Sequence, residues 1–300
     1  MIFRYLVIAI ISLITISIFL LPKTNLKLPI YSKSQIKANT QNVINPPPIL
    51  NDTNSQPPLL TARSAVIIDA KTYQILFEKE SNLMHLPASI TKLMTALITL
   101  EKCSPSQIVT IEQVEVEGTQ MGLSVGDRIT VENLLYGLLI NSGNDAAFAL
   151  ANACSDSLSQ FVLSMNQKAA DLEMVNTRFT NPAGFDDAFQ YSTAADLARL
   201  ANVATSNPLL AKIVATKSTV ITDATGIKTY YLENINQLLG IVQGVEGIKT
   251  GQTEGALENL ITRTTRNGNS IIAVILGSKD RFGESMQLIE WVFNNYHWVN

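Results

Sequence analysis

The chain has 300 residues, 46% of them hydrophobic and 16% charged, so it carries enough apolar material for a substantial core. A formal net charge of -3 provides no basic surface for nucleic acid. The two histidines, His85 and His297, lie far apart in the sequence, so we expect neither a metal centre nor a triad histidine. A hydrolase built on this chain needs another type of general base.

Residues 1–22 contain an apolar run from Tyr5 to Leu21, preceded by Arg4. About 17 apolar residues are the short limit for a membrane-spanning helix and exceed most signal-peptide cores. Because no small-residue cleavage site follows, we expect an uncleaved signal anchor, with a cleaved signal peptide as the alternative. Four lysines follow the run and would favour a cytoplasmic position, but a long folded domain can still be exported.

Residues 23–60 are polar and rich in proline, with Pro46-Pro47-Pro48 and Pro57-Pro58. This composition predicts a partly extended linker. Residues 61–300 are predicted to form the folded domain.

The predicted domain begins and ends with β-type segments. Runs at 62–70 and 74–79 flank a short polar turn, Lys71-Thr72-Tyr73. Near the other end, Asn267-Gly268 is a strong hairpin signal between runs at 260–266 and 270–277. Another β-type stretch begins near Gly247.

Helical patterns occupy most of the remaining domain, at 90–102, 131–140, 145–153, 158–172, 193–204 and 283–294. We therefore predict an α+β fold. A five-stranded antiparallel sheet is formed from both ends of the domain and flanked by helices, with a helical insertion between its halves.

A serine and a lysine stand three residues apart at the start of the first predicted helix. Ser89 and Lys92 therefore share one helical face. A lysine removed from water can lose its proton and activate a serine hydroxyl, and the free N–H groups of a helix start can hold an oxyanion. The pattern is weak alone, because Ser34 and Lys37 repeat it in the linker, where we expect no function.

Two further motifs could line a cleft. Ser142-Gly143-Asn144 lies between two apolar helical runs and could present one hydroxyl and one amide, whereas the similar Ser164-Met165-Asn166 lies inside a predicted helix and is expected to be structural. Lys249-Thr250-Gly251 lies in a β-type stretch, where the glycine would let substrate backbone approach. A solvated surface residue is the alternative for Lys249.

The order, spacing and flanks of these motifs resemble the serine D-Ala-D-Ala carboxypeptidases, the low-molecular-mass penicillin-binding proteins. The resemblance runs from about Ala62 to Trp298 and rests on PASITK (87–92), LLYGLL (134–139), SGNDAA (142–147), FTNPAG (179–184), STAADLA (192–198) and GIKTG (247–251). It implies a DD-peptidase/β-lactamase-like fold, a peptidoglycan stem peptide as substrate, β-lactams as covalent inhibitors and no cofactor. It also implies an extracytoplasmic location, with the membrane contacted through the N-terminal segment.

The resemblance implies catalytic roles for three residues. Ser89 would be the nucleophile that forms the acyl-enzyme, and Lys92 would be its base. Ser142 would relay a proton to the departing D-alanine, while Asn144 would hold the peptide amide of the substrate.

The resemblance assigns substrate binding to the β-type stretch. Lys249 and Thr250 would bind near the terminal carboxylate, beside Gly251. The backbone N–H groups of Gln252 and of the nucleophile would form the oxyanion hole. Arg281 is a further candidate for the carboxylate, with a surface salt bridge as the alternative.

Two departures from the family pattern stand out. After the third motif the family usually has an Ala-Gly pair, whereas here Ala256 is followed by Leu257. The chain also ends soon after the last predicted helix, so we expect the N-terminal anchor to replace the C-terminal membrane attachment of many relatives.

Cys103 and Cys154 end two helices whose other ends would face the site. A disulfide in an oxidising compartment and two buried thiols both remain open.

Four other functions compete with this prediction. A class A β-lactamase would have aspartate in place of Gly143 and a deacylating glutamate in the following loop, and no such motif occurs between Asp171 and Tyr191. A non-catalytic wall-binding module would not need Lys92 as a base. An endopeptidase or transpeptidase would use the same residues, so the sequence leaves the balance among these activities open.

Overall fold

The computed structural model describes residues 46–114 and 116–299. The apolar run Tyr5–Leu21 and most of the expected linker lie outside these residues, so the signal anchor and its cleavage stay predictions. Among the described residues, no helix combines the length and the hydropathy that crossing a bilayer requires.

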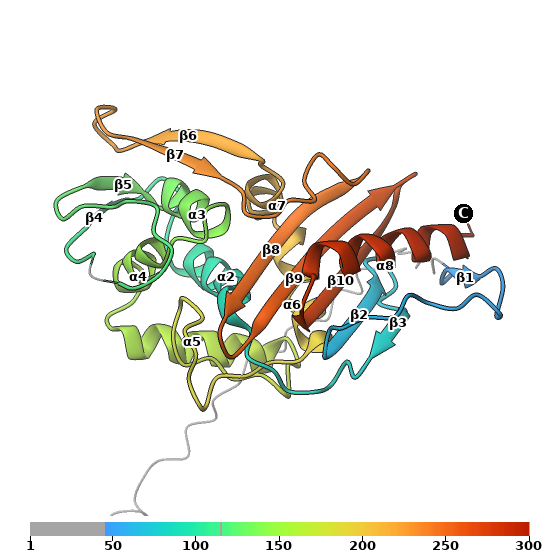
Figure 1. Ribbon diagram of the computed structural model, residues 1–300. Helices are drawn as coiled ribbons and strands as arrows, with labels where there is room; N and C mark the ends of the chain where they lie inside the picture. Colours follow the sequence, from blue (N-terminus) through green and yellow to red (C-terminus); the bar gives the residue numbers. More distant parts are fainter. Residues whose placement is uncertain (1–45, 115, 300) are drawn as a thin grey trace, which may run out of the picture. The chain divides into compact units, whose positions relative to one another are not determined.

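A five-stranded antiparallel sheet forms the centre of the domain, which confirms the predicted fold class. Its strand order is β3-β2-β10-β9-β8, so strands from both ends of the domain lie side by side (Figure 1). The positive φ angles of Asn267 and Gly268 form the predicted tight turn between β9 and β10. The strands are β2 (Ser64–Asp69), β3 (Ile75–Lys79), β8 (Val245–Thr253), β9 (Leu257–Arg266) and β10 (Asn269–Ser278).

Helices cover both faces of this sheet. Helix α8 (Arg281–Asn295) packs on β9 and β10, in front of them in Figure 1. The other helices form the insertion: α2 (Lys92–Lys102), α3 (Val131–Leu139), α4 (Asn144–Ala153), α5 (Leu158–Asp171), α6 (Ala194–Ser206) and α7 (Pro208–Val214). Of these, α6 packs on β2 and β10 and α7 packs on β8, on the opposite face of the sheet. Because both faces are covered, the inner strand β2 is buried along its whole length.

Alternate residues of β2 supply two separate hydrophobic cores. Ala65 and Ile67 pack in the core beneath α8, whereas Val66 and Ile68 join the larger core formed with the helical insertion. Helix α2 lies inside that larger core, and its residues Lys92–Thr99 are all buried. The sheet and the insertion thus hold the start of α2 in a fixed place.

Polar caps determine where several helices begin. The side chains of Thr130, Thr193 and Asp280 accept the backbone N–H of Asn133, Asp196 and Gly283 at the starts of α3, α6 and α8. Each cap satisfies one of the N–H groups that a helix start leaves unpaired. These starts lie within two residues of the predicted ones.

Some elements of the insertion were not predicted. They are α7 and two small hairpins, β4 (Ile108–Thr110) with β5 (Arg128–Thr130), and β6 (Ser218–Thr222) with β7 (Thr229–Glu233). Strands of three to five residues are too short for their alternation of exposed and buried positions to stand out in the sequence, so they give no clear signal.

The end of the expected linker, which was predicted to run to residue 60, packs on the domain. Strand β1 (Ile49–Leu50) pairs with β11 (Tyr296–His297), and Trp291 Nε1 donates to Ser55 Oγ at 3.1 Å. Local composition could not show this, because the pairing partner lies at the other end of the sequence.

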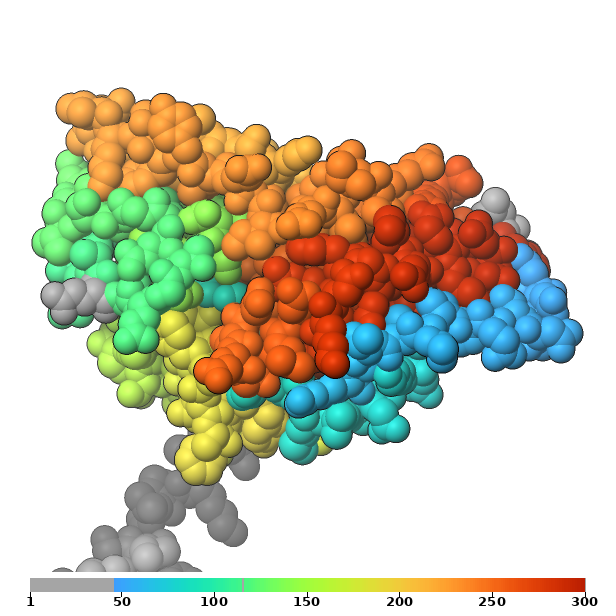
Figure 2. Space-filling view, viewed as in Figure 1, coloured from blue at the N-terminus to red at the C-terminus, as the bar shows by residue number. Residues whose placement is uncertain are grey.

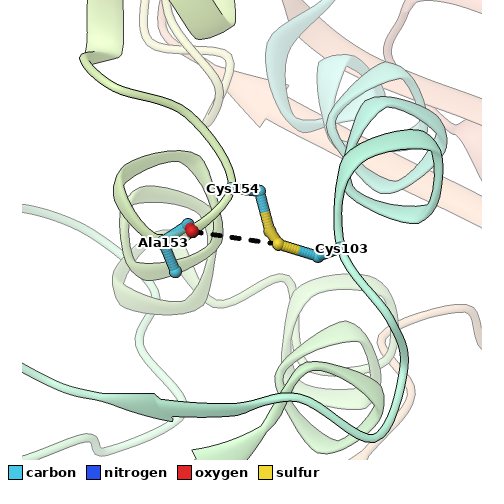
Figure 3. Close-up of a disulfide and its surroundings, with 3 residues drawn as sticks. All are labelled: Cys103, Ala153 and Cys154. Carbon is cyan, nitrogen blue, oxygen red and sulfur yellow. Dashed lines mark hydrogen bonds between the residues drawn. A yellow bond between two sulfur atoms is a disulfide. The ribbon is translucent and has the colours of Figure 1, made fainter.

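Cys103 and Cys154 form a disulfide with Cα atoms 5.6 Å apart, which settles the alternatives left open by the sequence. Figure 3 shows the bond joining the C-terminal ends of α2 and α4, with Cys103 Sγ 3.8 Å from the carbonyl oxygen of Ala153. The disulfide thus braces the two helices at the ends opposite to Lys92 and Asn144.

Replacing both cysteines by serine should lower the free energy of unfolding by about 4 kcal/mol, the loop-entropy value for a separation of 51 residues. Urea denaturation of the domain measures the change. A reductant should destabilise the parent protein by a similar amount and leave the Cys103→Ser/Cys154→Ser variant unchanged. Equal stability of parent and variant would show that the bond does not constrain the unfolded chain.

Candidate active site

Ser89 lies in a short 3-10 turn, η1 (Ala88–Thr91), that leads into α2. The sequence predicted a regular helix from about residue 90, and the structure places this tighter turn before it. Ala88 has a φ of 49°, and its carbonyl oxygen would lie 1.9 Å from a Cβ added at Gly184. The glycine of the FTNPAG segment is therefore required for the close approach that fixes the serine.

Lys92 is fully buried, and three oxygen atoms surround its amine. The Nζ atom lies 2.9 Å from Ser89 Oγ and donates to Asn144 Oδ1 at 2.7 Å and to the carbonyl oxygen of Ala183 at 2.6 Å. Two acceptors and one hydroxyl match a neutral amine, which has two N–H donors and one lone pair. Burial holds the pKa of Lys92 well below its usual value, and the charge of Lys249 lowers it further.

A second serine–lysine pair lies beside the first. Lys249 Nζ is 2.9 Å from Ser142 Oγ and donates to the carbonyl oxygen of Thr250 at 3.0 Å. Burial lowers the pKa of Lys249 to about 7, and the charge of Arg281 contributes. Ser142 has a φ of 60°, a backbone conformation that costs about 1–3 kcal/mol in a non-glycine residue and is common in functional sites.

The first turn of α4 holds the site from a third side. Besides accepting from Lys92, Asn144 donates through Nδ2 to the carbonyl oxygen of Glu117 at 2.6 Å. The next residue, Asp145, was not singled out from the sequence. Its carboxylate accepts the backbone N–H groups of Met121, Gly122 and Leu123 and so shapes the preceding loop. An acidic residue in the first turn of a helix was the available signal.

Strand β8 lines the remaining side. Thr250 and Gly251 are buried, whereas Gln252 is exposed. A Cβ at Gly251 would lie 3.0 Å from the carbonyl oxygen of Pro87 and 3.2 Å from the backbone nitrogen of Ser89. The glycine therefore lets the edge strand approach the turn that carries the serine.

Arg281 is buried at the start of α8 and donates through Nη1 to the carbonyl oxygen of Gly251 at 3.1 Å. Its position supports β8 from within the protein, so the alternative of a surface salt bridge is wrong. Leu257 occupies the position where the family usually has a glycine. Its φ of 56° is a backbone conformation that glycine adopts readily.

The structure thus brings together Ser89, Lys92, Ser142, Asn144 and Lys249, beside the residues of β8. Figure 2 shows teal atoms of the α2 region recessed between the green insertion and the orange strand β8. Ser164, from the second copy of the Ser-x-Asn pattern, lies on α5, where its hydroxyl donates to the carbonyl oxygen of Gln160. His85 is bonded through Nε2 to the carbonyl oxygen of Ala256 and takes no part in this cluster.

Comparison with known proteins identifies the family. The D-alanyl-D-alanine carboxypeptidase family (Peptidase_S11) matches residues 51–280. The D-alanyl-D-alanine carboxypeptidase DacF of Bacillus subtilis is 35% identical over 246 residues, which cover 78% of this chain and 63% of DacF. The D-alanyl-D-alanine endopeptidase of Escherichia coli is 29% identical over 248 residues, or 80% of each chain.

Among solved structures, the Streptomyces K15 DD-transpeptidase superimposes with a TM-score of 0.75 at 30% identity. The match covers 80% of this chain and 100% of that one. The chain spans less than two thirds of the length of DacF and of the DacD carboxypeptidase of Escherichia coli. The fold is that of a solved DD-transpeptidase. The chain belongs to the D-alanyl-D-alanine carboxypeptidase family, whose model matches residues 51–280.

The buried amine of Lys249 should make stability depend on pH. Its folded pKa is about 7 and its ordinary value is 10.5, so between these pH values the unfolded chain binds more protons than the folded one. The free energy of unfolding should therefore rise with pH, by up to about 1.4 kcal/mol per unit from this group. Between pH 7 and pH 10, denaturation experiments should show a smaller rise in the free energy of unfolding for Lys249→Met than for the parent protein. Parallel curves for the two proteins would contradict the low pKa.

Proposed function

We propose that this chain is a serine D-Ala-D-Ala carboxypeptidase that removes the terminal D-alanine from peptidoglycan stem peptides. The observation that carries the proposal is the buried amine of Lys92, 2.9 Å from Ser89 Oγ with its two N–H donors directed at other acceptors. A lysine held in this way can act as the general base, a role that neither histidine of the chain is placed to fill. Membership of the family supports the choice of substrate.

In the acylation step, Ser89 Oγ attacks the carbonyl carbon of the penultimate D-alanine while Lys92 takes the hydroxyl proton. The negative oxygen that forms is held by the backbone N–H groups of Ser89 and Gln252. Ser142 passes a proton to the departing amine and takes one from Lys249 Nζ, 2.9 Å away, and the C–N bond breaks. D-alanine leaves, and the peptide stays on Ser89 as an ester.

Residues of strand β8 are proposed to recognise the C-terminal end of the substrate. Lys249 and Thr250 are proposed to bind near the substrate carboxylate, with Gly251 leaving room for its backbone. Arg281, bonded to the carbonyl oxygen of Gly251, acts by positioning this strand. Water then enters the space left by D-alanine, gives a proton through Ser142 to Lys249, and attacks the ester carbonyl carbon. The ester C–O bond breaks as Ser89 Oγ takes its proton back from Lys92.

A β-lactamase activity has less support. The one glutamate between Asp171 and Tyr191 is Glu173, whose side chain is 84% exposed and paired with Arg199. A water-activating base must lie within hydrogen-bond reach of the acyl-enzyme, and an exposed surface ion pair does not supply one.

Two other reactions use the same acyl-enzyme. One relative is named an endopeptidase and one solved neighbour a transpeptidase. The amine that leaves and the nucleophile that enters distinguish these activities, so product analysis with a pentapeptide and a cross-linked dimer separates them. A non-catalytic wall-binding module is disfavoured, because burying a lysine amine beside a serine is costly and a binding protein gains nothing from it.

We also propose that the domain works outside the cytoplasmic membrane and is tethered there through residues 1–22. The apolar run Tyr5–Leu21 and the disulfide, which suits an oxidising compartment, support this location. Full-length protein should remain with membranes after alkaline extraction and keep its original N-terminus. A mature protein that begins beyond Lys23 would contradict the anchor.

Replacing Ser89 by alanine should abolish covalent labelling by penicillin, and Lys92→Ala should lower the labelling rate by about 10²–10⁴-fold, the usual contribution of a general base. Residues that act as one unit lose most of the rate when either is removed. Ser164→Ala is the matched control, because its hydroxyl bonds only within α5. Normal labelling of the Ser89 variant would refute the mechanism.

Penicillin and peptide should differ in the second step. The amine released from penicillin stays tethered to the acyl group and blocks the approach of water, whereas D-alanine departs. We therefore expect turnover of a D-Ala-D-Ala peptide but a penicilloyl-enzyme that persists for minutes or longer. Mass spectrometry after brief exposure to penicillin measures this lifetime. A rapid return to the unmodified mass, with many equivalents of hydrolysed drug, would instead identify a β-lactamase.

A further inference from the structure

The two halves of the proposed oxyanion hole lie on different parts of the chain. The backbone N–H of Ser89 belongs to the turn η1, whereas that of Gln252 belongs to the edge strand β8. Two N–H groups stabilise one oxyanion only when both lie about 3 Å from it, so their separation must be fixed. Contacts that hold η1 against β8 therefore contribute to the rate without touching the substrate.

The segment that leads into η1 is held by His85. The ring is buried, and its Nε2 donates to the carbonyl oxygen of Ala256 at 2.8 Å, in the turn between β8 and β9. The backbone N–H and carbonyl of His85 pair with Ser192 at 2.8 and 2.9 Å. Burial lowers the pKa of His85 from its ordinary value of 6.5, so the ring is neutral near pH 7. Because a carbonyl oxygen can only accept, the single ring proton is on Nε2.

Asn259 holds the next residue of the same segment. This asparagine is fully buried on β9, where it lies opposite Gly251 of β8 in the strand register. Its Nδ2 donates to the carbonyl oxygen of Leu86 at 2.9 Å, and its Oδ1 accepts the backbone N–H of Gly277 at 2.8 Å. The side chain therefore joins the segment before Ser89 to both β9 and β10.

These two bonds and one close packing contact connect the two sources of the oxyanion hole. His85 lies four residues before Ser89, and its partner Ala256 lies four residues after Gln252. Gly251 packs against the same turn, since a Cβ added there would lie 3.2 Å from the backbone nitrogen of Ser89. Loss of either bond leaves a backbone carbonyl oxygen without this partner and lets the turn and the strand move apart.

We propose that His85 and Asn259 are positioning residues of the oxyanion hole. Neither touches the substrate, and together they set the distance between the N–H groups of Ser89 and Gln252. They therefore stabilise the tetrahedral transition state more than the bound peptide. The inference rests on the proposed peptidase function and adds two residues to the site that performs it.

Substitutions at His85 separate the hydrogen bond from packing. Stopped-flow acylation by penicillin gives the limiting rate constant and the dissociation constant of the initial complex. In His85→Leu, which has no donor, the limiting rate should fall about tenfold, less than the about 10²–10³-fold cost of deleting an oxyanion donor, because the donor is displaced and not removed. The dissociation constant should stay nearly unchanged. His85→Gln keeps an N–H donor and should regain most of the rate, and Met84→Ala, at an exposed neighbouring position, is the control.

Asn259→Ala should slow acylation in the same way, and Asn202→Ala is its matched control. Asn202 is also buried, on α6, and its Nδ2 donates to the carbonyl oxygen of Ala70 at the same distance of 2.9 Å. Both variants lose a buried hydrogen bond of one kind and should lose similar stability, but only Asn259→Ala should lower the limiting rate. If His85→Leu does not fold, this pair of asparagine variants decides the test.

A boronic acid analogue of the substrate reports on the oxyanion hole directly. Ser89 Oγ bonds to boron and gives its proton to Lys92, so a negatively charged tetrahedral adduct forms that resembles the transition state. In His85→Leu and Asn259→Ala, the inhibition constant should rise by about the factor by which the limiting rate falls. The affinity for an unreactive peptide that ends in one D-alanine should not change.

The outcomes separate this inference from the function on which it rests. Unchanged limiting rates in folded His85→Leu and Asn259→Ala, or an equal loss in Asn202→Ala, would overturn the positioning role alone. Failure of the parent protein to release D-alanine from any D-Ala-D-Ala peptide would overturn the peptidase function. Selective loss of rate in the two variants, with recovery in His85→Gln and unchanged controls, would establish the positioning role.

Discussion

The burial of two lysine amines without a salt bridge is the constraint on which the site depends. Neither Lys92 nor Lys249 forms an ion pair within the described part of the chain, and both lie in the protein interior. Burying a charged amine in this way is unfavourable, so the neutral form gains in population. This burial lowers the free energy of unfolding. It also leaves a neutral amine that can accept a proton.

Three parts of the fold cooperate to keep these amines in place. The large core surrounds α2 and sets the position of Lys92, while Asn144 and the carbonyl oxygen of Ala183 orient its amine. Edge strand β8 brings Lys249 beside Ser142 from the opposite side. The disulfide joins α2 and α4 at their far ends, so the two helices that carry Lys92 and Asn144 are tied together.

Much of this arrangement could be predicted from the sequence, because its signals are local. Asn267-Gly268 specifies one hairpin, and long apolar patterns specify the helices. Other features depend on contacts between distant segments and left no local signal. Such features are the pairing of Ile49 with His297 and the close approach of Gly184 to Ala88. The disulfide belongs to the same group, since spacing alone could not decide between a bond and two thiols.

The most direct test of the central claim is the protonation state of the Lys92 amine. NMR titration of the Nζ resonance in lysine-labelled domain, assigned by comparison with Lys92→Met, measures it without substrate. We expect an amine that titrates well below the ordinary value of 10.5. A charged amine that titrates near 10.5 would contradict this mechanism, because such a group could not take the proton from Ser89.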